Sequence, residues 1–194
     1  MRDQETPKKH TIPNDTTATP TITLFVYGTL KRGYWNHDRF CRNAIDIQSA
    51  TAWGRLYELP AGYPALEVPE SIILAHGTAN PLADAATQAR LADLSPQHAA
   101  DRPPSGYWDL SHGELITVPD PARDLPPIDR LEGFRPGLES FYVRELVWVW
   151  CLSARQTAWL YVAGCVLTSP KPPRITDFTL HPAEIRMQKS EQKH

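Results

Sequence analysis

The sequence predicts an α+β fold built around a small barrel-like sheet. Segments rich in strand-forming residues outnumber helical segments, and glycine- or proline-rich turns separate most of them. No internal repeat and no coiled-coil heptad pattern is present. Because strands dominate and a few helices lie between them, the pattern favours the α+β class over an all-helical or a doubly wound α/β fold.

The strand predictions rest on alternation and on β-branched or aromatic content. Residues 142–152 give the strongest one, because valine, leucine and tryptophan are concentrated there. Residues 21–27 alternate with apolar side chains on both faces, which is typical of a central strand. Further strands are expected at residues 50–59, 113–118 and 157–162, and a hairpin turn at residues 153–156.

Three helices are expected between the strands. Asn36 is suited to cap the first. Asn80 is suited to cap the second, which is expected to continue to about residue 94. The third is expected at residues 125–131, opened by a Pro-Pro pair and ended by Gly133.

The 19 prolines divide the chain into regions. They cluster near both ends and in the middle, where proline and the residue before it resist regular helix and central strand. We therefore expect an N-terminal tail at residues 1–20, one folded domain at residues 21–168 and a C-terminal tail at residues 169–194. Within the domain, residues 71–111 are expected to be an insertion on the surface, with a helix as its only regular part.

Composition narrows the classes of function. The 194 residues carry a net charge of −2, so no global field favours nucleic acid or an acidic membrane surface. The start of the chain has no apolar stretch of signal-peptide type, and the apolar run at residues 146–152 is too short to span a bilayer. Three cysteines without CxxC spacing and seven scattered histidines indicate neither a disulfide framework nor a metal site. We expect a cytoplasmic protein that needs no metal and no cofactor; the oligomeric state is left open.

The first segment that carries possible chemistry is Tyr27-Gly28-Thr29-Leu30, which ends the first expected strand. A small-residue loop after a strand can point successive backbone N–H groups into one concavity, where they bind an anion. Gly28 lets a ligand approach the backbone without a Cβ in the way. For an isolated tripeptide of this kind, an ordinary strand-to-helix turn is the more frequent explanation. The spacing of a nucleotide-binding P-loop is absent.

The second such segment contains Glu132, in the last turn of the third expected helix. The negative end of a helix disfavours another negative charge, which predicts a raised pKa for this carboxyl group. A raised pKa suits a base that must also return its proton near neutrality. On periodicity alone, the better explanation is a solvent-facing side chain paired with Arg130 or Arg135.

Tyr142 and Arg144 open the strongest strand. Tyr142 is a candidate to line a pocket, and Arg144 is a candidate partner for a carboxylate. Their default roles are core packing and a surface charge. Trp148 and Trp150 share one face of the strand and are interpreted as packing residues, not as a platform for nucleic-acid bases.

Taken in order, these pieces resemble the AIG2-like γ-glutamylcyclotransferase family. The series is V-Y-G-T-L-K-R-G, G-x-L-Y-E-L with G-Y-P-A, G-E-L, D-x-L-E-G-F and Y-x-R-x-x-V, between residues 26 and 147. One piece alone would be a weak signal, whereas the ordered set is specific. The opening loop with Asn36-His37 is most similar to the γ-glutamylamine cyclotransferase branch.

The resemblance implies a fold, a reaction and a site. The fold is a small mixed β-barrel with flanking helices, and the reaction converts a γ-glutamyl amine or γ-glutamyl amino acid to 5-oxoproline plus the free amine. By position, Glu132 is the catalytic acid/base, and Tyr27, Gly28, Thr29 and Leu30 bind the glutamyl group. The partner is then a small-molecule γ-glutamyl substrate, with no cofactor and no metal. The expected insertion is longer than the usual connection of the family, so it is either a wall of the substrate site or a remote decoration.

Two other functions remain open at this stage. A non-catalytic module on the same fold would bind a small carboxylate in the same loop, but it would not need a carboxylate at residue 132. A cysteine hydrolase would use Cys41 or Cys151. Both cysteines lie in apolar periodic segments without a paired histidine, so this function ranks low.

Overall fold

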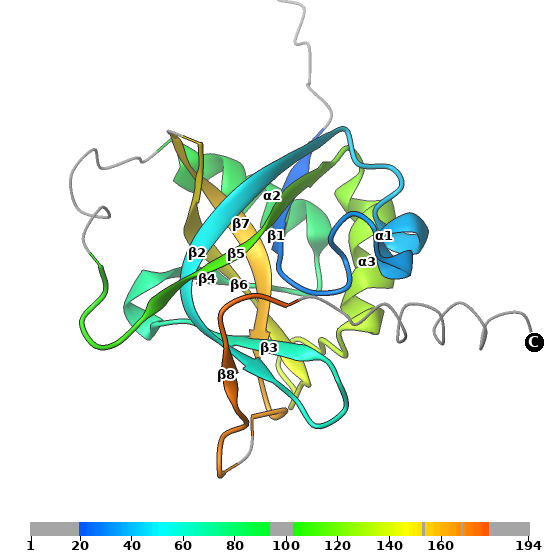
Figure 1. Ribbon diagram of the computed structural model, residues 1–194. Helices are drawn as coiled ribbons and strands as arrows, with labels where there is room; N and C mark the ends of the chain where they lie inside the picture. Colours follow the sequence, from blue (N-terminus) through cyan, green and yellow to red (C-terminus); the bar gives the residue numbers. More distant parts are fainter. Residues whose placement is uncertain (1–19, 94–102, 153, 168, 179–194) are drawn as a thin grey trace, which may run out of the picture.

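Five strands close into a barrel in the computed structural model, which describes residues 20–93, 103–152, 154–167 and 169–178 (Figure 1). The strands are β1 (Ile22–Val26), β2 (Asp46–Glu58), β3 (Pro64–Glu67), β4 (Ile73–His76), β5 (Asp109–Val118), β6 (Tyr142–Cys151), β7 (Ala154–Ala163) and β8 (Arg174–Ile175). The helices are α1 (Trp35–Phe40), α2 (Pro81–Ala92) and α3 (Pro121–Leu131), with a 3-10 turn at Glu70–Ile72.

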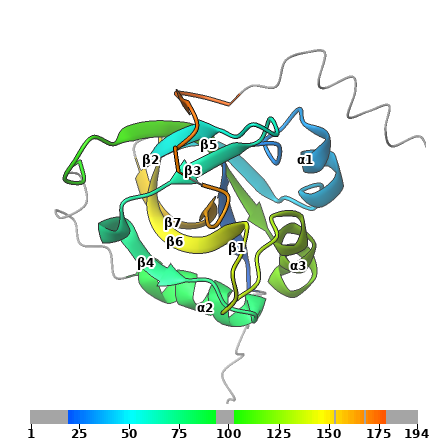
Figure 2. The same ribbon diagram turned by 90° about the horizontal axis from the view of Figure 1, so that it is seen from below.

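The closed path runs β2-β5-β1-β7-β6 and returns to β2. Its strands pair antiparallel except β1 and β7, which run parallel where Leu24 lies opposite Trp159. Short strands extend this ring, because β3 and β8 pair with β2, and β4 pairs with β6. Figure 2 shows the three helices outside the ring. The predicted fold class, an α+β fold with a small mixed β-barrel and flanking helices, is confirmed.

Two hydrophobic clusters account for this arrangement. One contains Phe25, Leu56 and Leu160, and the other contains Leu24 and Ile128, which comes from α3. Neighbouring residues of β1 therefore belong to different clusters, because successive side chains of a strand point to opposite faces. The predicted central strand with apolar residues on both faces is confirmed by this burial pattern.

Two helix starts differ from the sequence prediction. Helix α1 is preceded by Tyr34, so Asn36 is not its cap. Helix α3 begins at Pro121 and contains the Pro-Pro pair in its interior. Asp120 caps it by accepting a hydrogen bond from the backbone N–H of Arg123 at 3.1 Å. An aspartate cap followed by proline at the first helical position is a start signal that outweighs the internal prolines here.

The expected insertion at residues 71–111 is more regular than predicted. Its helix is confirmed as α2, capped by Asn80, and residue 94 lies outside the described residues. The segment also contains β4, which the short apolar run at Ile73 did not reveal, and the start of β5. A four-residue edge strand gives almost no periodic signal, and here its pairing with β6 decides its conformation.

The turn of the last hairpin and the C-terminal end of the domain also differ from expectation. Cys151 lies opposite Ala154, so the hairpin turn is shorter than residues 153–156. The structure differs from the expected tail at residue 169 as well, because β8 pairs with β2 and Phe178 is buried in the core. Residues 179–194 of that expected tail and residues 1–19 of the expected N-terminal tail at 1–20 lie outside the described residues.

Helix α2 is attached to the barrel through the side-chain amide of Gln88. Its Oε1 accepts from the backbone N–H of Thr23 at 3.0 Å, and its Nε2 donates to the carbonyl oxygens of Thr23 at 3.1 Å and Thr157 at 2.8 Å. The amide thus bridges β1 and β7 near Leu24 and Trp159, the residues at which these two strands pair in parallel. Gln88 and Thr157 are buried and Thr23 is partly buried, so the bridge satisfies backbone atoms that water reaches poorly.

We predict that Gln88→Leu destabilises the protein by about 2–4 kcal/mol, because it removes three hydrogen bonds to backbone groups of β1 and β7. Urea unfolding measures the change. Arg90→Leu, on the exposed side of the same helix, is the matched control and should change stability by less than about 0.5 kcal/mol. Equal effects of the two substitutions would contradict a bridging role for Gln88.

Candidate active site

A cavity of about 740 Å³ brings the predicted site residues together. Tyr27, Gly28, Thr29 and Leu30 line it from the end of β1, and Glu132 lines it from the end of α3. These groups are more than 100 positions apart in the sequence, and the barrel places β1 next to the face covered by α3. The cavity is within the usual size range of small-molecule sites.

The loop at residues 27–30 turns sharply away from β1. The backbone N–H of Lys31 donates to the carbonyl of Gly28 at 3.1 Å, which closes the turn. In the described part of the chain, the N–H groups of Gly28, Thr29 and Leu30 donate to no backbone oxygen. Backbone N–H groups of cavity-lining residues that have no backbone acceptor can bind a carboxylate or an oxyanion.

Two side chains from α1 hold the loop from the other side. The side-chain amide of Asn36 donates to the Thr29 hydroxyl at 2.8 Å, and Nδ1 of His37 lies 2.9 Å from the carbonyl oxygen of Leu30. Asn36 therefore supports the loop, which explains why it is not the helix cap. The Asn-His pair that follows the loop in the sequence has a structural role in placing it.

The next two residues of the loop motif anchor it to distant segments. Arg32 contacts Glu114 twice: its backbone N–H donates to one carboxylate oxygen at 2.7 Å, and its Nε donates to the other at 2.8 Å. Lys31 donates to the carbonyl of Phe178 at 2.9 Å and lies 3.3 Å from the Asp177 carboxylate. Figure 1 shows the segment after β8 crossing the barrel end towards this loop.

Glycines in the family motifs permit close approach around the same loop. A Cβ on Gly28 would lie 2.9 Å from Cγ of Pro64, and a Cβ on Gly113 would overlap the carbonyl oxygen of Val26. Gly28 therefore leaves room for a neighbouring side chain as well as for a ligand, which the sequence argument did not anticipate. Its replacement by a larger residue would disturb packing and binding together.

Glu132 follows α3 directly, as its C-terminal cap. Its backbone N–H donates to Ile128 at 2.9 Å, and Gly133 has a φ of 62°, the left-handed conformation expected after a helix. The carboxyl group is partly buried in the cavity wall. In the described part of the chain, no ion pair joins it to Arg130 or Arg135, so the solvent-facing interpretation does not hold.

The pKa of Glu132 is raised to about 7. Burial in the cavity wall is the larger cause, and the nearby Asp129 carboxylate is the second. The sequence predicted a raised pKa, which agrees with this result. It attributed the shift to the negative end of the helix, whereas the structure attributes it to burial and to Asp129. At neutral pH the group is divided between its acid and base forms, which is the state that proton transfer in both directions requires.

Two tyrosines complete the wall near Glu132. The hydroxyl of Tyr142 donates to the carbonyl of Pro64 at 2.8 Å, and that of Tyr27 donates to the carbonyl of Tyr161 at 2.6 Å. Burial raises the pKa of both groups, with the Glu132 charge as a smaller cause. Both hydroxyls remain protonated and fix the wall, so Tyr27 contributes shape to the cavity while its hydroxyl serves the fold.

The sequence analysis missed a buried ion-pair network behind Glu132. Arg144 is almost fully buried and pairs with Asp84 of α2 and with Asp129 of α3. Its guanidinium also donates to the carbonyl of Thr78 at 2.9 Å, and Asp129 accepts from the Tyr161 hydroxyl at 2.6 Å. The pairing of Arg144 with a carboxylate was named as a candidate role, but only the structure identifies two carboxylates from two helices.

The structure also bears on the cysteine-hydrolase alternative, on the expected insertion and on metal binding. Burial raises the pKa of the Cys41 thiol to about 12, with Asp124 as the second cause, and Cys151 is also buried. Neither thiol suits a nucleophile. Of the described residues in the expected insertion at 71–111, none lines the cavity, so a remote decoration is favoured over a substrate wall. Among the described residues, no group of three or more His, Cys, Asp or Glu side chains is placed to hold a metal ion.

We predict that Asp129→Asn lowers the pKa of Glu132 from about 7, because it removes the neighbouring negative charge. Carbon-13 NMR titration of the Glu132 carboxyl measures the change. Asp84→Asn is the matched control, since it also weakens the pairing of Arg144. Both substitutions should lower the melting temperature, but only Asp129→Asn should move the titration. Equal shifts in the two variants would contradict a direct effect of Asp129.

Glu132 should also make stability depend on pH. Its pKa is above the ordinary value of 4.5, so the fold disfavours the charged form. Wild-type stability should therefore fall as pH rises from about 4.5 to about 7, by up to about 3 kcal/mol. Glu132→Gln should gain relative stability between pH 4 and pH 8 in urea unfolding. The exposed Glu139→Gln should show no such gain, and a flat difference for both variants would contradict the raised pKa.

In the described part of the chain, no helix combines the length and apolar content needed to cross a membrane.

No protein of curated function matches the chain. Similar solved structures include an AIG2-like protein from Mus musculus, which is 17% identical, with 84% of this chain and 92% of that chain covered and a TM-score of 0.45. YkqA from Bacillus subtilis is 19% identical, with 89% and 43% covered and a TM-score of 0.44. An uncharacterised protein from Pyrococcus horikoshii is 17% identical, with 89% and 99% covered and a TM-score of 0.41.

A family model described as "Gamma-glutamyl cyclotransferase, AIG2-like" matches residues 24–107. The matched stretch contains the loop at residues 27–30 and ends before Glu132. Over that stretch, the match confirms that the chain resembles the AIG2-like γ-glutamylcyclotransferase family.

Proposed function

We propose that the protein is a cyclotransferase that converts a γ-glutamyl amine or γ-glutamyl amino acid to 5-oxoproline and the free amine. One observation carries the proposal: Glu132, with a pKa of about 7, lines the same cavity as Gly28, Thr29 and Leu30, whose N–H groups donate to no backbone oxygen among the described residues. A proton carrier and a set of N–H donors are the two elements that cyclisation needs.

The reaction forms one bond and breaks one. The α-nitrogen of the glutamyl group attacks its own γ-carbonyl carbon, which forms the ring of 5-oxoproline, and the amide bond to the leaving amine then breaks. Two protons leave the α-nitrogen in the process, and both end on the departing amine, which leaves as an ammonium ion. No water, oxidant or reductant is consumed.

Glu132 serves the proton transfers in this proposal. As a carboxylate it accepts a proton from the α-ammonium group, which frees the nitrogen to attack. As an acid it then protonates the leaving amine. Because its pKa is about 7, both directions are accessible near neutral pH, whereas a carboxyl at its ordinary pKa would be a poor acid.

The loop serves charge and orientation. The carbonyl oxygen becomes negative when the nitrogen attacks, and N–H groups fixed in place stabilise such an oxyanion without reorganisation. Both reacting groups belong to one molecule, so holding it in a ring-like pose can supply about 7–11 kcal/mol of the barrier. The contacts of Asn36 and Arg32 with the loop and with Glu114 support its fixed shape.

The finer assignments belong to the same proposal. The resemblance of the loop, with Asn36-His37 after it, favours the γ-glutamylamine branch and therefore a γ-glutamyl amine as substrate. A cytoplasmic location is in keeping with three free cysteines, of which Cys165 is exposed. The proposal includes no cofactor, no nucleic acid and no membrane partner.

The second candidate function is a non-catalytic module that binds a small carboxylate in the same cavity. The free amides of the loop would suit either function. A binding module, however, gains nothing from a buried carboxyl group with a pKa of about 7, which repels an anionic ligand when it is charged. That observation favours the enzyme.

Glu132→Gln should lower the rate of 5-oxoproline release from γ-glutamyl amines by at least about 10²–10⁴-fold, because the amide cannot accept the proton. Circular dichroism should show an unchanged fold. In the wild type, kcat/KM should fall as pH decreases below about 7, when Glu132 becomes protonated.

Glu139→Gln, on the exposed loop after α3, is the matched control and should keep wild-type activity. Chromatography of 5-oxoproline measures product with each member of a panel of γ-glutamyl amines and amino acids. Near-wild-type release by Glu132→Gln would sink the mechanism. Binding of the panel without any release by the wild type would favour the non-catalytic module.

A further inference from the structure

The cavity has a deep end and an exposed mouth. At the deep end, Tyr27 and Leu30 are buried, and the loop amides lie beside them. At the mouth, three large apolar side chains are exposed although they line the cavity: Tyr63 is 51% exposed, Phe141 is 60% exposed and Leu131 is 39% exposed. Exposed apolar side chains gathered at one opening indicate a binding surface.

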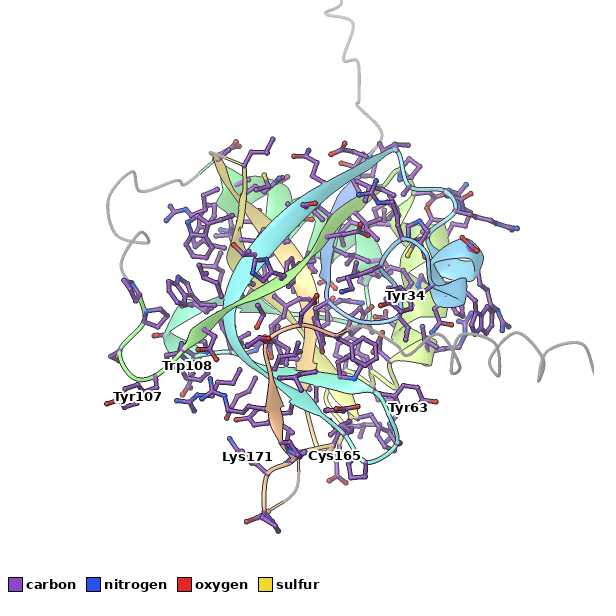
Figure 3. All side chains as sticks on the ribbon, viewed as in Figure 1. Tyr34, Tyr63, Tyr107, Trp108, Cys165 and Lys171 are labelled. Atoms are coloured by element: carbon purple, nitrogen blue, oxygen red, sulfur yellow. The ribbon has the colours of Figure 1, made fainter. Side chains whose placement is uncertain are left out.

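Leu131 and Phe141 lie next to Glu132 in the cavity wall. Leu131 precedes it directly, and Phe141 packs on the next residue, since a Cβ on Gly133 would lie 3.2 Å from Cβ of Phe141. Tyr63 lines the same cavity, whose wall also holds Glu132 and Tyr142. Figure 3 shows Tyr63 on the hairpin that joins β2 and β3.

The charged residues of the cavity wall disfavour a substrate whose leaving amine carries a second ammonium group. Among the described residues that line the cavity, only Arg130 and Glu132 carry a formal charge. Glu132 has to remain available for proton transfer under the proposed function. A second ammonium group on the substrate would therefore lose water, meet the like charge of Arg130 and gain no dedicated carboxylate.

We propose that the leaving amine of the substrate carries an uncharged hydrocarbon group, alkyl or aromatic, which packs against Tyr63, Leu131 and Phe141. This inference rests on the proposed function, which holds the glutamyl half at the deep end. The half that departs must then occupy the mouth, and the mouth buries hydrocarbon at a gain that a charged group would forgo.

A matched pair of substrates tests the inference. γ-Glutamylhexylamide and γ-glutamyl-1,5-diaminopentane have amine halves of equal length and differ in a terminal methyl or ammonium group. We expect kcat/KM to be roughly tenfold or more higher for the hexylamide, mainly through a lower KM. An equal or higher value for the diaminopentane compound would overturn the inference.

Two variants locate the preference. Tyr63→Ala combined with Phe141→Ala should reduce it to less than about threefold, because the apolar contact is lost. Tyr107→Ala is the control, since Tyr107 is 89% exposed and is not part of the cavity wall. A preference that survives the double substitution unchanged would overturn the assignment to the mouth.

Binding separates this inference from the proposed function. Glutaric acid monohexylamide and its 5-aminopentyl counterpart lack the α-amine, so they bind without reacting, and calorimetry with the wild type gives both dissociation constants. Tighter binding of the hexylamide supports the apolar mouth even if no γ-glutamyl compound releases 5-oxoproline, in which case only the proposed function fails. Absence of binding, or tighter binding of the aminopentyl compound, overturns the inference.

Discussion

The buried charge of Arg144 is the constraint on which the arrangement of barrel and helices depends. A guanidinium group on β6 without access to water must be neutralised, and it is neutralised by Asp84 of α2 and Asp129 of α3. Removal of one partner from such a network costs about 3–5 kcal/mol, because the remaining charge stays buried. Both helices are therefore fixed to the same point of the barrel wall, and the end of α3 that carries Glu132 is fixed with them. The ring of Phe134, 4.7 Å from the guanidinium carbon, packs the chain that leaves α3 against the same group.

The same network links fold stability to the state of the site. Asp129 neutralises Arg144 on one side, and on the other its charge helps to raise the pKa of Glu132. A carboxyl group that resists ionisation makes the folded protein less stable above neutral pH. The proposed chemistry nevertheless needs that resistance. Sites of this kind often sacrifice stability for activity. Gln88, one turn after Asp84 in α2, stabilises the barrel without lining the cavity, so fold stability and the state of the site also depend on separate residues.

Much of the fold follows from local sequence signals, and the failures have identifiable causes. Strands with continuous apolar content, such as β6 and β1, were predicted within a few residues, and the Asn80 cap and the Gly133 end were correct. The short strands β3, β4 and β8 were missed, because two to four residues carry no periodicity and take their conformation from their partners. Residues 27–30 and Glu132 were named from a family resemblance. Their shared cavity could not be deduced from sequence, since barrel closure brings them together. Arg144 was named without its two partners, because ion pairing across 15 and 60 positions leaves no local pattern.

The family motifs are explained by the support that the loop at residues 27–30 needs. Free backbone amides are useful only if the loop keeps one conformation, and an isolated loop of four residues would not. Arg32 ties it to Glu114 of the G-E-L motif, and Pro64 of the G-Y-P-A motif fills the space beside Gly28. Pro64 in turn accepts the hydroxyl hydrogen bond of Tyr142, which opens the Y-x-R-x-x-V motif and lies beside Glu132. The motifs that are scattered along the sequence are thus connected by contacts from the loop to Tyr142, which lines the same cavity as Glu132. Such continuity favours a preorganised site, in which donors and proton carrier are in place before a substrate binds.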